Sequence, residues 1–336
     1  MKPSILIILC AVLGLMCCLS LTLGKYPVGI GDMAAFFLYK TAGAGPMGVA
    51  DAELMENLLF DIRLPRILAA MLIGAALSTS GASFQALFTN PLVSPKMLGV
   101  LSGASFGAVS AMLFTRSWFV VQASAAAFGF IAVGAAIGIA RLYRTDSIIM
   151  LVLGGIISEA LFTSLISIVK YVADPYDDLP AITYWLMGNL SFVNLRTVTI
   201  AGVPILAGVF ALMLYGKHLN VLSLGDEEAH SLGVNIRVIR YGIIFFATLA
   251  STLTVVIGGM VGWVGLIIPH VARMLVGPNN IILLPASALL GAIYLLLADG
   301  LSRLLFSFEI PIGIVTSLFG IPFFLYILRN AKKGWS

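Results

Sequence analysis

The sequence has 336 residues, of which 60% are apolar and only 10% charged, and it carries a formal net charge of +4. Soluble domains contain about 25% charged residues, so the composition excludes a water-soluble protein. The basic excess does not indicate a nucleic-acid partner, because the Lys and Arg residues lie singly between apolar runs and form no basic stripe.

Apolar windows of about 20 residues, separated by charged residues or by Pro and Gly, predict about ten transmembrane helices. In chain order they lie at 3–23, 64–87, 97–115, 119–140, 147–170, 192–215, 241–260, 262–276, 281–303 and 312–329. The first window is too long for a signal peptide and lacks a small-residue cleavage site, so we expect it to span the membrane. The expected fold class is an all-α membrane protein with one transmembrane domain over residues 1–336.

The distribution of basic residues predicts the orientation. Placing the N-terminus in the cytoplasm puts 11 of the 19 Lys and Arg residues inside and 8 outside, in the direction of the positive-inside rule. Both termini are then cytoplasmic, segments 24–63 and 171–191 are periplasmic, and segment 216–240 is cytoplasmic. We expect an amphipathic helix at 51–60, and two short helices punctuated by Gly225 and Gly233 in segment 216–240. Such a surface helix pair suits docking of a soluble partner.

Motifs for catalysis are missing from the sequence. It contains no H-E-x-x-H, no Cys/His cluster with metal spacing, no nucleophile elbow and no phosphate-binding G-x-x-x-x-G-K-[ST] loop. We therefore expect no catalytic residue, no metal site and no cofactor in this chain. Glu159 is the one acid deep within a predicted span, where it would be either a proton relay or, as we favour, a neutral or hydrogen-bonded carboxyl.

Small residues four apart predict close helix packing, because they let two backbones approach. The pairs are Gly103/Gly107, Gly134/Gly138 and Gly258/Gly262. They indicate a tight bundle and say nothing about a solute.

Five motifs in order resemble the permease family of type II ABC importers, which handle cobalamin, ferric siderophores, haem and sometimes oxyanions. They read RLPRILAAMLIGAALSTSGASFQALFTNPLVSPKMLGVLSGASFGA (63–108), LNVLSLGDEEAHSLGV (219–234), VGWVGLIIPHVAR (261–273), LLPASALLGAIYLLLADGLSR (283–303) and EIPIGIVTSLFGIPFFLYIL (309–328). The resemblance covers nearly the whole chain. It implies a ten-span, non-enzymatic permease of the bacterial or archaeal inner membrane.

The resemblance also implies partners and site residues. The permease would pair with an identical copy, two ATP-binding subunits that hold ATP and Mg, and a periplasmic binding protein. Arg63, Arg66 and Arg303 match exposed external arginines that receive acidic residues of the binding protein. Asn90, Pro91 and Leu92 match a turn that narrows the pathway at its cytoplasmic end. The positions that match the coupling helices, which seat on the ATPase, are Leu219, Leu224, Gly225, Asp226, Glu227, Ala229, Leu232 and Gly233.

The solute is predicted less directly. The tract 174–190 resembles a branch that includes molybdate and tungstate importers as well as iron-chelate systems. An oxyanion route would be helped by a cationic lining, and the sequence shows no intramembrane Lys or Arg cluster. We therefore favour a metal chelate such as a ferric siderophore or haem, with molybdate, tungstate or cobalamin as alternatives. Two rivals from other classes are a proton-driven carrier that uses Glu159 and a purely structural subunit.

Overall fold

A computed structural model describes residues 2–42, 48–142 and 148–331, and within these ranges the chain is helical with no strand. The helices are α1 (Lys2–Thr22), α2 (Ile30–Ala42), α3 (Val49–Glu56), η1 (Asn57–Arg63), α4 (Leu64–Leu87), η2 (Pro95–Leu98), α5 (Val100–Phe114), α6 (Trp118–Leu142), α7 (Ile148–Val172), α8 (Asp178–Leu186), α9 (Leu195–Leu214), α10 (Gly216–Leu222), α11 (Asp226–Ser231), α12 (Ile236–Gly258), α13 (Val264–Val276), α14 (Asn280–Leu304) and α15 (Ile312–Ala331). Helices suit these apolar runs because each backbone group is bonded within its own segment.

The predicted windows coincide with apolar helices. Within the described ranges, seven helical stretches are long and apolar enough to cross a membrane, namely those that contain α1, α4, α6, α7, α9, α12 and α14. Three shorter apolar helices, α5, α13 and α15, fall on the three remaining windows. The all-α membrane fold is confirmed, and the count of ten crossings stays a prediction.

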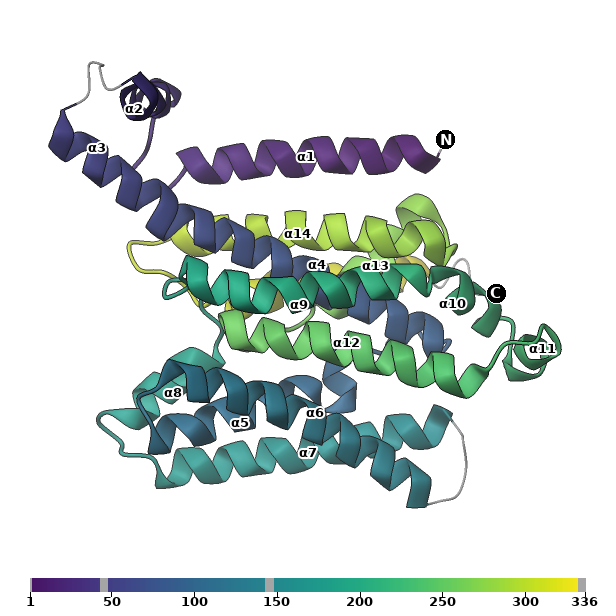
Figure 1. Cartoon of the computed structure of the whole chain (residues 1–336). Coiled ribbons are helices and arrows are strands. Elements are labelled where there is room, and N and C mark those ends of the chain that lie inside the picture. The colour runs from purple at the N-terminus through teal and green to yellow at the C-terminus, as the bar shows by residue number, and fades with distance from the viewer. Residues whose placement is uncertain (1, 43–47, 143–147, 332–336) are drawn as a thin grey trace.

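Helix α4 forms the centre of the bundle, where it packs against α9, α12, α13 and α14 (Figure 1). Helix α1 flanks α14 at one edge, and α5, α6 and α7 form a layer at the opposite edge. The buried share of a helix decreases from the centre of the bundle to its edges. Most of the α4 window is buried, whereas much of the surface of α1 and α7 is exposed. Open faces on spanning helices contact lipid, a second chain or a solute pathway.

The bundle has two ends that carry different features. Figure 1 places α2, α3 and α8 at one end and α10 and α11 at the other; we call them the Arg63 end and the Asp226 end. Helix α1 begins at the Asp226 end, and α15 runs back toward that end from Ile312, which bonds Gly188 at the Arg63 end. The first and last helices are therefore arranged as an even number of crossings requires. Of the basic residues used for orientation, Arg144, Lys332 and Lys333 lie outside the described residues.

Two local expectations need correction. The amphipathic helix predicted at 51–60 is not separate, because α3, η1 and α4 form one continuous helical stretch from Val49 to Leu87 with a π-helical section at Asn57–Arg63. The segment predicted to end at residue 240 ends at Asn235, whose side chain caps α12 by accepting a hydrogen bond from the backbone N–H of Val238. The two short helices expected in this segment are present as α10 and α11. We refer to residues 216–235 as the α10–α11 segment.

Candidate functional site

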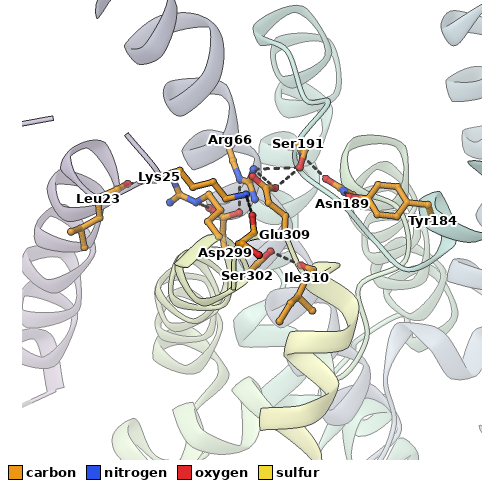
Figure 2. Close-up of polar contacts among 12 residues, drawn as sticks. Leu23, Lys25, Arg66, Tyr184, Asn189, Ser191, Asp299, Ser302, Glu309 and Ile310 are labelled. Carbon is orange, nitrogen blue, oxygen red and sulfur yellow. Dashed lines mark hydrogen bonds and ion pairs between the residues drawn. The ribbon is translucent and has the colours of Figure 1, made fainter. Parts of the chain in front are cut away.

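A buried charge network lies at the Arg63 end, between α4, α14 and the loop that precedes α15 (Figure 2). The Nε of Arg66 donates to Oδ1 of Asp299 at 2.6 Å, and its Nη1 donates to Oε2 of Glu309 at 2.9 Å. Arg303, four residues after Asp299 on α14, places its Nε 3.1 Å from Oδ2 of the same carboxylate. Asp299 is fully buried, so one carboxylate holds two arginines in the interior.

The three predicted docking arginines are therefore not exposed, and this corrects the sequence-based expectation. Arg63, Arg66 and Arg303 are 4%, 6% and 8% exposed. Arg63 donates through Nη1 and Nη2 to the carbonyl oxygens of Leu21 and Tyr26, which fastens the end of α1 to the Arg63 end. Each of these guanidinium groups lies against carbonyl or carboxylate oxygens of the protein itself, because a buried charge without a partner would cost free energy. Their use in docking stays a prediction.

Glu309 links the network to the surface. Its Oε2 accepts from the hydroxyl of Ser191 at 2.5 Å as well as from Arg66. Partial burial alone would raise the pKa of Glu309, but the hydrogen bond from Ser191 and the charge of Arg66 outweigh it and hold the pKa below its ordinary value. Sequence analysis did not select Glu309 or Asp299 as partners, although the i, i+4 spacing of Asp299 and Arg303 was a usable signal.

The predicted cytoplasmic gate is a compact turn after α4. Oδ1 of Asn90 accepts a hydrogen bond from the backbone N–H of Leu92 at 2.9 Å, which is the Asx-turn that an Asn-Pro sequence favours. Leu92 is exposed beside the partly buried Pro91. The turn thus presents an apolar side chain on a rigid support, which suits a constriction, and its role as a gate stays a prediction.

The predicted coupling positions divide into anchors and exposed residues. Leu219 and Ala229 are fully buried in one apolar cluster, while Leu224 and Leu232 are 63% and 62% exposed. Gly225 and Gly233 have φ of +118° and +76°, which favours glycine, so the two turns around α11 depend on these residues. Asp226 pairs with Arg240 of α12 through Nη2 at 3.0 Å, and Glu227 is exposed. The α10–α11 segment is a fixed, surface-facing structure with apolar and acidic groups on its outside.

Glu159 is paired within the bundle. Its Oε1 lies 3.6 Å from Nζ of Lys96, and η2, which carries Lys96, packs against the middle of α7. Glu159 is eleven residues past the start of α7, or about 17 Å along the helix axis. The ammonium group of Lys96 therefore lies beside the middle of α7, although more than half of its side chain is exposed. Pro91 and Pro95 lie in the segment between α4 and α5 that brings Lys96 beside α7.

No group of three or more His, Cys, Asp or Glu side chains able to hold a metal ion occurs in the part of the chain that the structure describes. The charged groups described above serve as ion pairs and as caps of backbone carbonyls. The arrangement is that of a polytopic membrane protein with a charged end, a turn at the opposite end of α4 and a surface helix pair.

Comparison with known proteins identifies the family. The FecCD transport family matches residues 11–330, so this chain belongs to that family. The molybdate import system permease protein MolB of Haemophilus influenzae is 37% identical over 332 residues, covering 99% of this chain and 97% of the relative. The hemin transport system permease protein HmuU of Yersinia pestis is 36% identical over 287 residues, covering 84% of this chain and 86% of the relative.

A solved structure of a metal-chelate type ABC transporter in an inward-facing conformation has a TM-score of 0.86 and 36% identity, and the match covers 98% of this chain and 99% of that chain. Taken together, the relatives are permeases for iron chelates, haem, cobalamin and molybdate. The chain is thus a multi-pass permease subunit of an ABC importer in the bacterial inner membrane. Family members work with ATPase and binding-protein partners and are not themselves enzymes.

Proposed function

We propose that two copies of this chain form the pathway of an importer for a metal chelate, driven by two ATPase subunits that dock on the α10–α11 segment. A periplasmic binding protein delivers the solute at the Arg63 end, and the turn at Asn90–Leu92 narrows the pathway near the Asp226 end. ATP and Mg belong to the partner ATPase in this proposal, and this chain carries no cofactor of its own.

The observation that carries the proposal is the construction of the α10–α11 segment. Leu224 and Leu232 are exposed, although large apolar residues on a surface outside the membrane favour burial against a partner. Buried Leu219 and Ala229 fix the segment to α12 and α14, so a force applied to its surface would reach spanning helices. A secondary carrier driven through Glu159 has less support, because that carboxylate already pairs with Lys96 and family members take their energy from an ATPase.

The burial of the three arginines changes how a binding protein could dock at the Arg63 end. Because Asp299 and Glu309 already hold Arg66 and Arg303, acidic residues of a binding protein would have to compete with these carboxylates or use exposed neighbours such as Lys25. We infer that the network presents the external loops in a fixed arrangement and that docking exchanges some of its internal pairs.

Molybdate is a second candidate solute. The match to MolB extends over 99% of this chain, so it includes the tract at 174–190 that the sequence analysis connected with molybdate and tungstate importers. An oxyanion and an acidic chelate both carry negative charge, and either would suit a pathway with basic groups.

The test is reconstitution of the permease in proteoliposomes with its ATPase and binding protein. Replacing both exposed leucines (Leu224→Ser with Leu232→Ser) should reduce ATPase binding and ATP-driven uptake at least tenfold, while the permease still elutes as a folded dimer. Leu142→Ser is the matched control, since Leu142 is also exposed at the Asp226 end but lies outside the α10–α11 segment. Full ATPase binding by the double variant would refute the assigned docking surface.

A further inference from the structure

Helix α7 carries a polar stripe on a membrane-spanning segment. Glu159, Thr163, Ser167 and Lys170 follow one another at intervals of three or four residues, which places them on one side of the helix. Thr163 and Ser167 are exposed, and Glu159 and Lys170 are partly exposed. Ionisable side chains in spanning helices face water-filled cavities or protein because contact with lipid is costly. The stripe therefore does not face lipid.

Three residues of the stripe, Glu159, Thr163 and Lys170, border a groove of about 440 Å³, which we call the α7 groove. Its other walls come from the start of α5, from the end of α8 and from Met260 after α12. The lining combines charged side chains with hydroxyl groups and with the apolar residues Leu101, Ile166, Leu186, Met187 and Met260; the charged and hydroxyl-bearing residues are Lys96, Ser102, Glu159, Thr163, Lys170 and Thr183. A mixed lining with a few convergent polar groups is typical of a small-molecule site.

The charges of the groove favour an anion. The groove is lined by two ammonium groups, on Lys96 and Lys170, and by one carboxylate, on Glu159. The distance of 3.6 Å between Lys96 and Glu159 is beyond that of a good hydrogen bond, and the Lys96 side chain is 58% exposed. No carboxylate pairs with Lys170 within the described ranges. An incoming anion could thus reach Lys170 directly and displace Glu159 from Lys96.

We propose that the α7 groove is a site for anionic oxygen groups of the transported solute, either an oxyanion or the carboxylates of a metal chelate. Lys96 and Lys170 contact the solute, and Glu159 is an internal counter-ion that returns to Lys96 when the solute leaves. This deepens the proposed function, on which it rests, by assigning a charge to the solute and a place on the pathway.

The test measures the electrostatic potential of the groove and does not require import. Thr163→Cys is introduced after Cys10, Cys17 and Cys18 are changed to serine, and the purified permease is reconstituted in vesicles of zwitterionic lipid. Reaction rates are measured with sulfonatoethyl and trimethylammonioethyl methanethiosulfonates and normalised to those of a free thiol. The anionic reagent should react faster by about threefold or more, as one excess positive charge nearby would produce.

Two nearly isosteric variants make the test specific. Lys170→Gln should lower the anionic preference and Glu159→Gln should raise it. Leu161→Cys is the control position, because Leu161 is an exposed apolar residue on another side of α7 and should react slowly with both reagents. A preference for the cationic reagent at Thr163→Cys, or a preference that Lys170→Gln leaves unchanged, would overturn the proposal.

Competition between a solute and the labelling reagent then distinguishes an oxyanion from the carboxylates of a chelate. Slower labelling of Thr163→Cys in millimolar molybdate assigns an oxyanion, and slower labelling in millimolar ferric citrate assigns the carboxylates of a chelate. Protection by neither would count against a solute site. Loss of coupling to the ATPase would appear only in the uptake assay, so failure of the proposed function and failure of this site are distinguishable.

Discussion

At the scale of single residues, Asp299 carries the strongest electrostatic constraint. Its fully buried carboxylate pairs with both Arg66 and Arg303, and Glu309 supplies a second negative charge beside Arg66. Asp299→Asn should destabilise the permease by about 3–5 kcal/mol, because it leaves buried guanidinium charge without a counter-ion. Thermal unfolding in detergent measures the loss. Arg116→Gln removes a highly exposed pair with Asp177 and should leave the melting temperature unchanged. Equal melting temperatures for the two variants would contradict the prediction.

Glu309 gives the same network a pH dependence. Its pKa in the folded protein lies below the ordinary value of 4.5, so the folded state binds the proton more weakly than the unfolded chain does. The ionised carboxylate of Glu309 therefore stabilises the folded protein fully above the unfolded pKa, and this contribution is lost as the pH falls through the lower folded pKa. Wild type should exceed Glu309→Gln in stability by less than about 1 kcal/mol at pH 7, after allowance for solvent screening. The difference should shrink in parallel melts as the pH falls below 4.5; a difference that grows on acidification would refute the prediction.

Sequence reasoning expected three exposed arginines, and the structure shows that all three are buried. The RLPR and ADGLSR motifs identify Arg63, Arg66 and Arg303, but a motif does not show which carboxylates lie beside it in space. Asp299 is near Arg303 in sequence, whereas the contact between Arg66 and Glu309 spans 243 positions. The neighbour of Lys96 was likewise not predictable, because a charged residue between two apolar windows indicates a surface position and does not show that Glu159 of α7 lies 3.6 Å away.

At the scale of helices, the bundle depends on glycine at two crossings of α4. A Cβ on Gly74 would collide with the carbonyl of Gly291 on α14, and a Cβ on Gly81 would collide with that of Gly265 on α13. Gly74→Ala should therefore destabilise the protein by about 2 kcal/mol or more through overpacking. Gly134→Ala is the matched control, since nothing lies within 4 Å of a Cβ there. Fluorescence-detected thermal unfolding compares the two, and similar melting temperatures would show that α4 is less tightly held than described.

Most helices were predictable from composition, and the deviations have local causes. The window 64–87 coincides with α4, because no charged residue interrupts the helix after Arg66 in its first turn. The glycine pair Gly103/Gly107 does pack closely, against α6, but no atom lies within 4 Å of a Cβ at Gly134, Gly138 or Gly262. Four-residue spacing shows that a close approach is possible and does not show which face is covered. Helix α2 and the π-helical η1 were missed because neither leaves a distinct apolar period.

At the scale of the whole molecule, α4 connects the two ends. It begins beside Arg66 in the charge network and ends at the turn of Asn90, Pro91 and Leu92. Along its length α4 packs closely against α14 at Gly74 and against α13 at Gly81. Helices α12 and α14 lie against α4 and also contact the α10–α11 segment, so a force applied by an ATPase there could reach α4 through them.

Coupling to an ATPase also requires that the α10–α11 segment faces the cytoplasm, because an ATPase can act on it only from that side of the membrane. Ser231 lies exposed in α11, and Tyr176 is highly exposed at the opposite end before α8. In a background with serine at Cys10, Cys17 and Cys18, a membrane-impermeant maleimide should label Ser231→Cys in inside-out vesicles and Tyr176→Cys in right-side-out vesicles.

Detergent-solubilised protein, in which both cysteines should react, controls for accessibility in this labelling. The expected contrast between the two vesicle types is at least tenfold, because the bilayer excludes the charged reagent. Labelling of Ser231→Cys from the periplasmic face would place the helix pair where no ATPase can reach it. The buried anchors Leu219 and Ala229 would then hold a surface for some other partner, and energy would have to enter the bundle elsewhere.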